Sequence, residues 1–290
     1  MKSEKMGGNS RIFGIIGFPV KHTLSPHFQN AAFASLGMDA IYIPFEVPPE
    51  KLKSSFASIK ALGFSGINVT IPHKQAVLSL VDELSPEVKG IGAANTIVFR
   101  NGKAKAYNTD GEGFIRSLKN DLKIDPKGRS VLLFGCGGAA KAIAFVLARE
   151  GARSITFVDQ AEKRAKELSA KTKKDFRRCG TKYIPFLGPR IDEEVWDSDL
   201  LVNASPMGMH KADACIVDPK ALHKGLAVYD IVYNPPVTPL LKAAKKKGIK
   251  ASNGLGMLLY QGVLSFEFFT GKKAPVSVMR AALKEAVKKC

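Results

Sequence analysis

Residues 131–160 have the sequence VLLFGCGGAAKAIAFVLAREGARSITFVDQ, and this stretch decides the fold. It opens with Val131–Phe134, a short apolar run typical of a buried strand, which leads directly into a glycine-rich turn. A helical stretch follows at Lys141–Arg149. A second strand at Ser154–Val158 then ends in Asp159, about twenty residues beyond the turn. Strand, tight turn, helix and acidic strand end, in this order, predict a dinucleotide-binding βαβ unit.

The residues of the turn suit the phosphates of a dinucleotide. Gly135 permits the tight turn, Gly137 lets a pyrophosphate approach the backbone, and Ala140 lets helix and strand pack closely. Gly138 and Ala139 lie between them at the helix N-terminus, where free N–H groups and the positive dipole end favour an anion. The alternative, a glycine-rich turn without a ligand, is disfavoured because strand, turn, helix and acid occur together.

Length and composition bound the class of protein. The chain has 290 residues, enough for two domains, and its 45% hydrophobic and 24% charged residues are typical of a soluble globular protein. No apolar stretch is long enough to span a membrane, so no membrane partner is expected. The four cysteines form no CxxC pair and the five histidines no ligand set. We therefore expect a cytoplasmic protein that needs no metal.

The formal net charge of +18 raises the question of a nucleic-acid partner. Basic residues are dense at 163–178 and 242–250, in segments that also have helical apolar spacing. We interpret these runs as solvated helix faces, because no basic stripe interleaved with aromatic residues supports base stacking. The expected partner is a small molecule rather than a nucleic acid, and a positive field helps to steer an anionic one.

Strands and helices alternate on both sides of the glycine turn. Before it, the pattern predicts strands at 12–18, 40–45, 65–71 and 93–99, helices at 26–36 and 50–62, and a turn at 101–102. From the turn onward, it predicts strands at 130–134, 154–158, 182–186, 199–203 and 226–232, and finally helices at 255–269 and 276–288. The fold class expected is α/β with two domains: a mostly parallel unit over residues 1–109 and a doubly wound, Rossmann-type unit over 110–253. The active-site cleft is expected between them.

Polar segments lie at element ends in the first unit, where open α/β sheets bind ligands. Thr23 and Ser25 are two hydroxyls spaced two apart, suited to a polyhydroxylated or carboxylate ligand. The alternative is that Ser25 only caps a helix that begins at Pro26, and both can be true. Three further segments complete a predicted polar cleft, namely Asn68–Lys74, Gly92–Thr96 and Asn108–Gly111.

Two charged residues in these segments suit proton transfer. Lys74 is expected at a helix start, where the dipole disfavours a cation and so favours release of its proton. The alternative for Lys74 is an ordinary surface lysine. Asp110 precedes an amphipathic stretch, and its alternative role is that of a helix N-cap.

Taken in order, these motifs resemble the shikimate dehydrogenase family, including its quinate/shikimate branch. Later segments resemble it too, at Asn203–Met209, Asp230–Pro235 and Gly254–Gly262. The resemblance extends from Gly17 to Gly271. It implies reversible NAD(P)-dependent reduction of 3-dehydroshikimate to shikimate, a step of aromatic amino acid (chorismate) biosynthesis.

The resemblance also implies roles on the substrate side. Lys74 and Asp110 would be the catalytic pair: the lysine hands a proton to the substrate carbonyl oxygen while the aspartate holds the lysine. The residues that would bind substrate are Asn95, Thr70 and Gln261 at the ring hydroxyls, Thr23 and Ser25 at the carboxylate, and Tyr233 beside the ring. The helices of residues 254–290 would pack back on the substrate domain.

On the cofactor side, the resemblance adds residues to those of the glycine turn. Those near the nicotinamide would be Gly254 and Met257. Those along the rest of the cofactor would be Asn203, Ala204, Ser205 and Met207. It implies no metal, in agreement with the histidine and cysteine pattern.

Two departures from the family pattern bear on specificity. The family usually has serine where Thr23 stands, and the added methyl makes the carboxylate end tighter, which leaves both shikimate and quinate open. NADP-using members carry Asn-Arg-Thr where this chain has Asp159-Gln160-Ala161. A carboxylate there accepts hydrogen bonds from ribose hydroxyls and repels a 2′-phosphate. Gln160 cannot replace the guanidinium. We therefore predict NAD over NADP, with Arg164 or Lys163 able to support some NADP use.

Three functions are compared. The first is a shikimate dehydrogenase of biosynthesis, and the second an NAD-dependent quinate/shikimate dehydrogenase of quinate catabolism. The third, motivated only by the charge, is a catalytically silent sensor or nucleic-acid-associated protein, and the complete catalytic pair disfavours it. A monomer or homodimer is expected.

Overall fold

The structure is a computed structural model that describes residues 7–186, 188, 190–210 and 212–289. The chain divides into two compact units. Unit 1 comprises Met1–Thr109 and Gln261–Cys290, and unit 2 comprises Asp110–Tyr260. Unit 1 is therefore built from two segments that are far apart in the sequence. In the described ranges, no helix is both long and apolar enough to cross a membrane.

Unit 1 contains a six-stranded sheet in the order β2-β1-β3-β5-β6-β4. Its strands are β1 (Arg11–Gly17), β2 (Ala40–Glu46), β3 (Gly66–Val69), β4 (Glu83–Leu84), β5 (Thr96–Arg100) and β6 (Lys103–Tyr107). Its helices are α1 (Ser25–Ser35), η1 (Pro49–Lys51), α2 (Leu52–Ala61), η2 (Ala76–Ser79), α3 (Pro86–Ile91), the second part of α9 (Leu255–Thr270) and α10 (Val276–Lys288).

The sheet of unit 1 is parallel only in part. Strand β1 pairs in parallel with β2 and β3, whereas β5 is antiparallel to both β3 and β6. The turn predicted at Asn101 and Gly102 explains the reversal, since both residues have positive φ angles, 51° and 72°. Two consecutive positive φ angles make the tight hairpin turn that joins antiparallel strands. Strand β6 escaped prediction because its inward residues, Ala104 and Ala106, are too small to give a strong apolar alternation.

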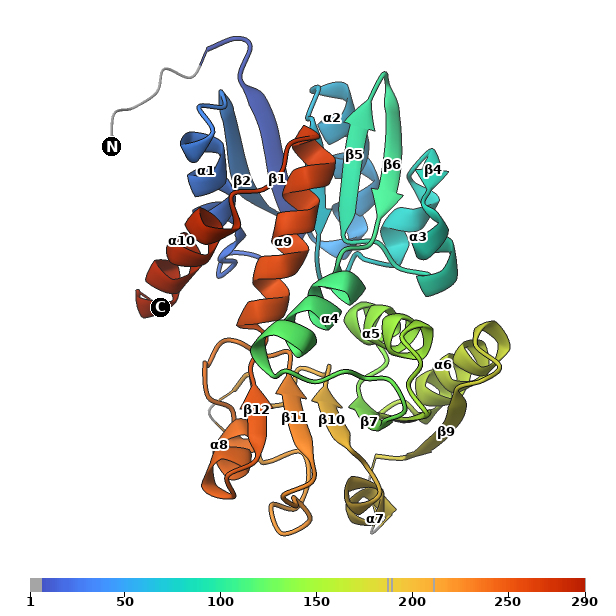
Figure 1. The fold of residues 1–290 in the computed structure, drawn as a ribbon. Helices are drawn as coiled ribbons and strands as arrows, with labels where there is room; N and C mark the ends of the chain where they lie inside the picture. Colours follow the sequence, from blue (N-terminus) through green and yellow to red (C-terminus); the bar gives the residue numbers. More distant parts are fainter. Residues whose placement is uncertain (1–6, 187, 189, 211, 290) are drawn as a thin grey trace. The chain divides into compact units, whose positions relative to one another are not determined.

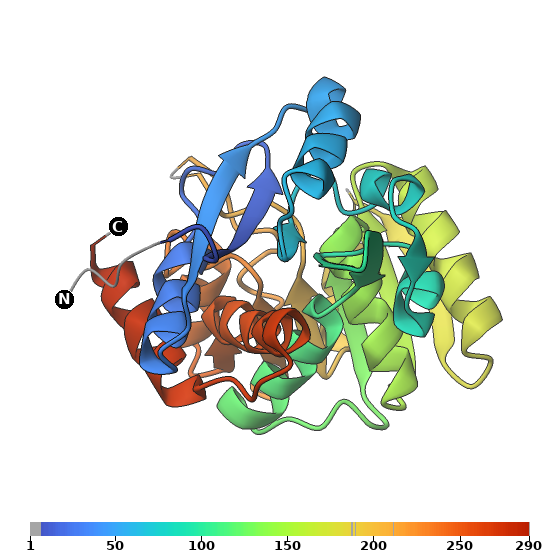
Figure 2. The same cartoon turned by 90° about the horizontal axis from the view of Figure 1, so that it is seen from above.

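The C-terminal segment completes the core of unit 1. Helix α10 packs along α1, which Figures 1 and 2 show from two directions. Phe269 of α9 packs on Phe13 of β1, with ring centroids 5.2 Å apart, and Phe266 packs on Phe33 of α1 at 5.4 Å. The rings of Phe13 and Phe33 also stack on each other, so β1, α1 and α9 share one aromatic cluster.

Unit 2 contains a six-stranded, wholly parallel sheet in the order β12-β11-β10-β7-β8-β9 (Figure 1). Its strands are β7 (Ser130–Phe134), β8 (Ser154–Asp159), β9 (Gly180–Pro185), β10 (Leu200–Asn203), β11 (Ala227–Asp230) and β12 (Lys250–Ser252). Its helices are α4 (Asp110–Asp121), α5 (Gly138–Arg149), α6 (Glu162–Asp175), α7 (Arg190–Trp196), α8 (Pro239–Lys246) and the start of α9. This order is that of a doubly wound sheet, with the switch point between β7 and β10. It confirms the predicted Rossmann-type fold.

Strand β7 shows why the apolar run at its position predicts a central strand. Val131 and Leu133 belong to one buried cluster of side chains, whereas Leu132 and Phe134 belong to another. Successive side chains of a strand point to opposite faces, so both faces of β7 are covered.

Two element predictions in unit 1 differ from the structure. The helix expected over 50–62 is present, but it begins as the 3-10 helix η1, and its α-helical part, α2, starts at Leu52. Lys74 does not lie at the start of a helix: residues 71–75 form turns, and only the short 3-10 helix η2 follows. The dipole argument for Lys74 therefore falls away, because a single 3-10 turn lacks the aligned peptide units of an α-helix.

Candidate functional site

The glycine turn of unit 2 is closely packed on one side. Gly135 has a φ of +89°, and a Cβ added there would lie 2.7 Å from the carbonyl oxygen of Ala204. The amide of Ala204 donates to the carbonyl of Phe134 at 2.8 Å, so the loop after β10 lies against the turn. Gly135 thus has two reasons to be glycine: a backbone conformation that other residues rarely adopt, and a close approach of backbone.

The other side of the turn is open. A Cβ added at Gly137 would meet nothing within 4 Å. Gly137 is the N-cap of α5 and has no side chain with which to occupy the N–H groups of the first turn. Gly138 and Ala139 begin the helix half-buried, and Ala140 is fully buried against the sheet. These features fit a pyrophosphate, which needs open space and free donors at a helix N-terminus.

The acidic strand end ties the turn to β8. One carboxylate oxygen of Asp159 accepts a hydrogen bond from the amide of Cys136 at 2.8 Å, and the other accepts from the amide of Ala161 at 2.8 Å. Burial, together with the charge of Asp159, raises the pKa of the Cys136 thiol to about 12. Cys136 therefore stays a protonated thiol, a small residue that fits the turn.

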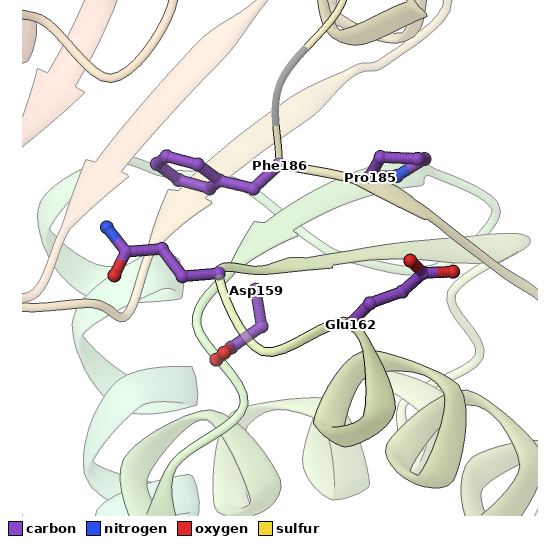
Figure 3. A pocket seen from close by; sticks show the side chains of 5 residues that line it. Asp159, Glu162, Pro185 and Phe186 are labelled. Atoms are coloured by element: carbon purple, nitrogen blue, oxygen red, sulfur yellow. The ribbon is translucent and has the colours of Figure 1, made fainter.

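A pocket of about 410 Å³ lies at the ends of β8 and β9 (Figure 3). Its lining residues are Asp159, Gln160, Glu162, Pro185 and Phe186. Figure 3 shows Glu162 at the start of α6 and Phe186 beyond the end of β9. The pocket thus combines two carboxylates, an amide and an aromatic face, whereas Arg164 lies exposed two residues further along α6.

The loops that follow β10 and β11 are held by a buried pair. The side-chain oxygen of Asn203 accepts from the amide and hydroxyl of Ser205, at 3.1 and 2.6 Å. Its nitrogen donates to the carbonyl of Met207 at 2.9 Å and to Asp230 at 3.0 Å. Tyr233 follows β11 and is half-buried. The four expected cofactor residues from Asn203 to Met207 therefore form one fixed loop.

Gly254 and Met257 are placed differently from each other. A Cβ at Gly254 would overlap the carbonyl oxygen of Ile231, so this glycine is required by a close approach to the loop after β11. Met257 is 6% exposed and belongs to the buried cluster under α4 and α5.

Polar side chains meet around Asn95 in unit 1. Its side-chain oxygen accepts from the amide of Thr109 at 2.8 Å and from the hydroxyl of Thr96 at 3.0 Å. Its nitrogen donates to the hydroxyl of Thr109 at 2.9 Å and to the side-chain oxygen of Gln261 at 3.3 Å. Asn95 and Gln261, both expected to bind ring hydroxyls, are thus brought together from residues 166 apart.

Further buried polar residues bind to this cluster, and the sequence does not predict them as a group. Asn68 donates to the carbonyl of Asn95 and to the hydroxyls of Thr96 and Ser265, and it accepts from the hydroxyl of Tyr42 at 2.8 Å. Asn68 lies in the predicted polar segment Asn68–Lys74, but the sequence predicts no role of its own for it. Ser265 had one available signal: it lies four residues after Gln261, on the same face of α9.

The start of helix α1, at Thr23 and Ser25, differs from the capping arrangement that the sequence predicts. Helix α1 begins at Ser25 itself, and its N-cap position is Leu24. It is Thr23 whose hydroxyl accepts from the amide of Ser25, at 3.3 Å. The alternative that Ser25 is the helix cap is therefore wrong. The Ser25 side chain is buried and hydrogen-bonded to Tyr42, whose pKa burial raises well above its usual value.

The backbone of Lys74 is anchored beside Asn95, and Asp110 follows in the sequence a residue that binds Asn95. The carbonyl of Lys74 accepts from the amide of Ala94 at 2.8 Å. Asp110 follows Thr109, whose amide binds Asn95, and it is buried at the start of α4. Thr70 lies between these segments and the end of β1, where its amide donates to the carbonyl of Ile16 at 2.9 Å.

A Rossmann-type unit, joined in one chain to a unit with clustered buried polar side chains, defines the class of protein: a two-unit, dinucleotide-dependent dehydrogenase. Among the described residues, no group of His, Cys, Asp and Glu side chains could hold a metal.

Comparison with known proteins narrows the class. Residues 15–97 match the model of the shikimate dehydrogenase substrate binding domain, and residues 254–284 match that of the shikimate 5′-dehydrogenase C-terminal domain. The chain is 45% identical over 289 residues to a shikimate dehydrogenase (NADP(+)) of Methanopyrus kandleri, covering 98% of each chain.

Solved structures agree with the sequence comparison. A shikimate dehydrogenase in complex with NADP+ has a TM-score of 0.89 at 35% identity, covering 98% of each chain. A shikimate 5-dehydrogenase from Listeria monocytogenes, in complex with shikimate and NAD, has a TM-score of 0.88 at 32% identity, covering 97% of this chain and 99% of that one. The chain belongs to the shikimate dehydrogenase family.

Proposed function

We propose that this protein is a shikimate dehydrogenase that reversibly reduces 3-dehydroshikimate to shikimate in aromatic amino acid biosynthesis. The observation that carries the proposal is the Asn95 cluster, where Asn95, Thr109 and Gln261 bring amide and hydroxyl groups to one place in unit 1. Such groups suit a polyhydroxylated ring. Membership in the family, at 45% identity to a protein of that name, supports the same substrate.

Lys74 and Asp110 are proposed as the catalytic pair. In the reduction, the ammonium of Lys74 gives a proton to the carbonyl oxygen, and in the oxidation the amine takes it back. Asp110, buried at the start of α4, orients the lysine. When bound, the nicotinamide gives or takes the hydride at the carbon that bears this oxygen.

The remaining substrate residues hold the ring in place. Asn95, Gln261 and Thr70 are proposed at the ring hydroxyls, and Tyr233 beside the ring. Thr23 and Ser25 are proposed at the carboxylate. The hydrogen bond from the Ser25 amide to Thr23 supports this pairing, because it fixes the two hydroxyl-bearing residues relative to each other.

For the cofactor, we propose that the open side of the turn, from Gly135 to Ala140, takes the pyrophosphate. The loop from Asn203 to Met207 is proposed to lie along the cofactor, with Gly254 and Met257 near the nicotinamide. The pocket beside Asp159 and Gln160 takes the adenosine half, and its two carboxylates favour the unphosphorylated ribose of NAD. Arg164, exposed on α6, provides the residual attraction for a 2′-phosphate.

The molecule is proposed to act on small molecules in the cytoplasm, as a monomer or homodimer. The free thiols of Cys136, Cys179 and Cys215 support a reducing compartment. Sedimentation at micromolar concentration measures the assembly directly.

Initial rates of reduced-cofactor formation, for shikimate or quinate with NAD or NADP, test the proposal. We expect turnover of shikimate with both cofactors, a kcat/KM higher for NAD, and slower or no turnover of quinate. No turnover of shikimate with either cofactor would refute the function. A higher kcat/KM for NADP would refute the cofactor preference alone, and faster turnover of quinate would move the protein to quinate catabolism.

A further inference from the structure

Asp230 is a carboxylate buried at the end of β11 in unit 2, with 0% of its surface exposed. Three neutral groups donate to it: the side-chain amide of Asn203 at 3.0 Å, the amide of Val232 at 3.1 Å and the hydroxyl of Thr238 at 2.6 Å. Burial of a carboxylate among neutral donors costs desolvation free energy. Packing alone therefore does not explain why an aspartate stands at this position.

The three donors belong to two different loops. Asn203 ends β10 and stands opposite Asp230 in the parallel ladder, and it fixes the loop that contains Ser205 and Met207. Val232 and Thr238 lie on the loop after β11, which carries Tyr233 and leads into α8. The Thr238 hydroxyl also caps α8 by accepting from the amide of Leu241. One carboxylate thus holds both loops at the carboxyl edge of the sheet.

The loops held by Asp230 also contact the glycine turn and Gly254. The loop after β10 starts with Ala204, whose carbonyl occupies the space beside Gly135. The loop after β11 reaches Gly254, whose amide donates to the carbonyl of Val232 at 3.3 Å. Movement of either loop would therefore alter the surface on which a dinucleotide lies.

We propose that Asp230 is a positioning residue that fixes the loops after β10 and β11 and thereby sets the affinity of unit 2 for its dinucleotide. The inference rests on the proposed function only for the identity of the ligand, a dinucleotide bound by unit 2. At position 230, a side-chain oxygen must accept from the Asn203 side chain and from the Val232 amide. The group that faces Thr238 can be either an acceptor or a donor, because the hydroxyl of Thr238 can donate or accept a hydrogen bond. An asparagine at this position therefore retains most of the function, and an alanine does not.

The test compares Asp230→Ala, Asp230→Asn and Thr238→Val with wild type, and uses Asp197→Asn, an exposed aspartate after α7, as the matched control. The dissociation constants of NADH and NADPH are measured by nicotinamide fluorescence without substrate. We expect Asp230→Ala to weaken binding at least about tenfold, equivalent to about 1.4 kcal/mol. Asp230→Asn should stay within about threefold of wild type, with Thr238→Val between them and the control unchanged.

Amide hydrogen exchange separates positioning from general destabilisation. We expect faster exchange at the amides of Ser205, Met207 and Val232 in Asp230→Ala, with exchange in β7 and β8 unchanged. A uniform rise over the whole of unit 2, or dissociation constants within twofold of wild type in both Asp230 variants, would overturn the proposal. If Asp230→Ala does not fold, Thr238→Val decides, and a dissociation constant within twofold of wild type for that variant would overturn the proposal.

The two proposals fail separately. Wild-type protein that binds NADPH but does not oxidise shikimate would refute the function and leave the binding test of Asp230 in force. Wild-type protein that turns over normally, with Asp230 variants that bind as it does, would refute only the positioning role. Absence of dinucleotide binding by wild type would overturn both.

Discussion

Lys74 is the residue whose proposed role has the largest kinetic consequence. Replacing Lys74 by alanine removes the proton donor, and we expect kcat to fall about 10²- to 10⁴-fold, the usual range for general acid–base catalysis. Shikimate binding, measured by calorimetry, should change much less, because the Asn95 cluster is intact. Lys53→Ala, an exposed lysine on α2, serves as the control. A kcat within tenfold of wild type would contradict the role.

Asp230 also predicts a dependence of stability on pH. Burial raises the pKa of Asp230 from 3.8 to about 6, with hydrogen bonds from Thr238, Val232 and Asn203 opposing the rise. The folded protein therefore holds this proton more tightly than the unfolded chain does. The contribution of Asp230 to the free energy of unfolding consequently decreases as pH rises from about 4 to 6. The total decrease is about 3 kcal/mol, since one pKa unit corresponds to about 1.4 kcal/mol.

Urea unfolding at several pH values, wild type against Asp230→Asn, isolates this effect. The stability of wild type relative to the variant should decrease from pH 4 to pH 7, because the asparagine does not titrate. A difference that stays constant across this range would show that the carboxylate keeps its ordinary pKa.

Single residues were predictable where local chemistry identifies them. Gly135 and Asp159 were found because a turn and a strand end require those residue types within one βαβ unit. Asn68 and Ser265 were not, since their hydrogen bond joins residues 197 apart and neither has a local pattern of its own. Asp230 lay inside a recognised motif, but its partners on two loops become apparent only in the folded chain.

Among the elements, α4 and α9 approach each other closely at Gly256. A Cβ there would overlap the Ser117 hydroxyl and the Asp121 carboxylate, which are joined by a hydrogen bond of 2.6 Å and receive another from Tyr229. We expect Gly256→Ala to destabilise the protein by about 1–3 kcal/mol, as overpacking does. Gly8→Ala, where a Cβ would meet nothing within 4 Å, is the matched control. Equal melting temperatures of the two variants in calorimetry would contradict this packing.

Element type was predictable and element limits were not. All five strands expected in unit 2 are present. The apolar runs of β7, β8, β10 and β11 are buried almost throughout, whereas β9 is largely half-buried or exposed. The short strands β4 and β12, of two and three residues, have no room for a periodic pattern. The helix start expected at Lys74 is absent: residues 71–75 form turns that lead into η2, where the amide of Val77 binds the carbonyl of His73.

For the molecule as a whole, the class of fold was predictable because alternation of strands and helices leaves few topologies open. The net charge was less informative about the fold and the function. The chain has 44 basic and 26 acidic residues, which is an excess of 18 positive charges. Ion pairs such as Lys60–Asp82 and Lys182–Glu194 include partly exposed groups, and pairs of this kind contribute little to stability. The excess acts instead through the field that it creates, which attracts anions such as phosphorylated cofactors.

The discontinuity of unit 1 has a consequence for biosynthesis. On the ribosome, Phe13 and Phe33 emerge early, but the phenylalanines that cover them, Phe269 and Phe266, are added some 230 to 260 residues later. At about 5–20 residues per second, the nascent chain carries an incomplete aromatic cluster for roughly ten to fifty seconds. Unit 2, a continuous segment, has all its strands by then. We therefore expect unit 2 to fold before unit 1, because unit 1 is complete only after α9 and α10 have been synthesised.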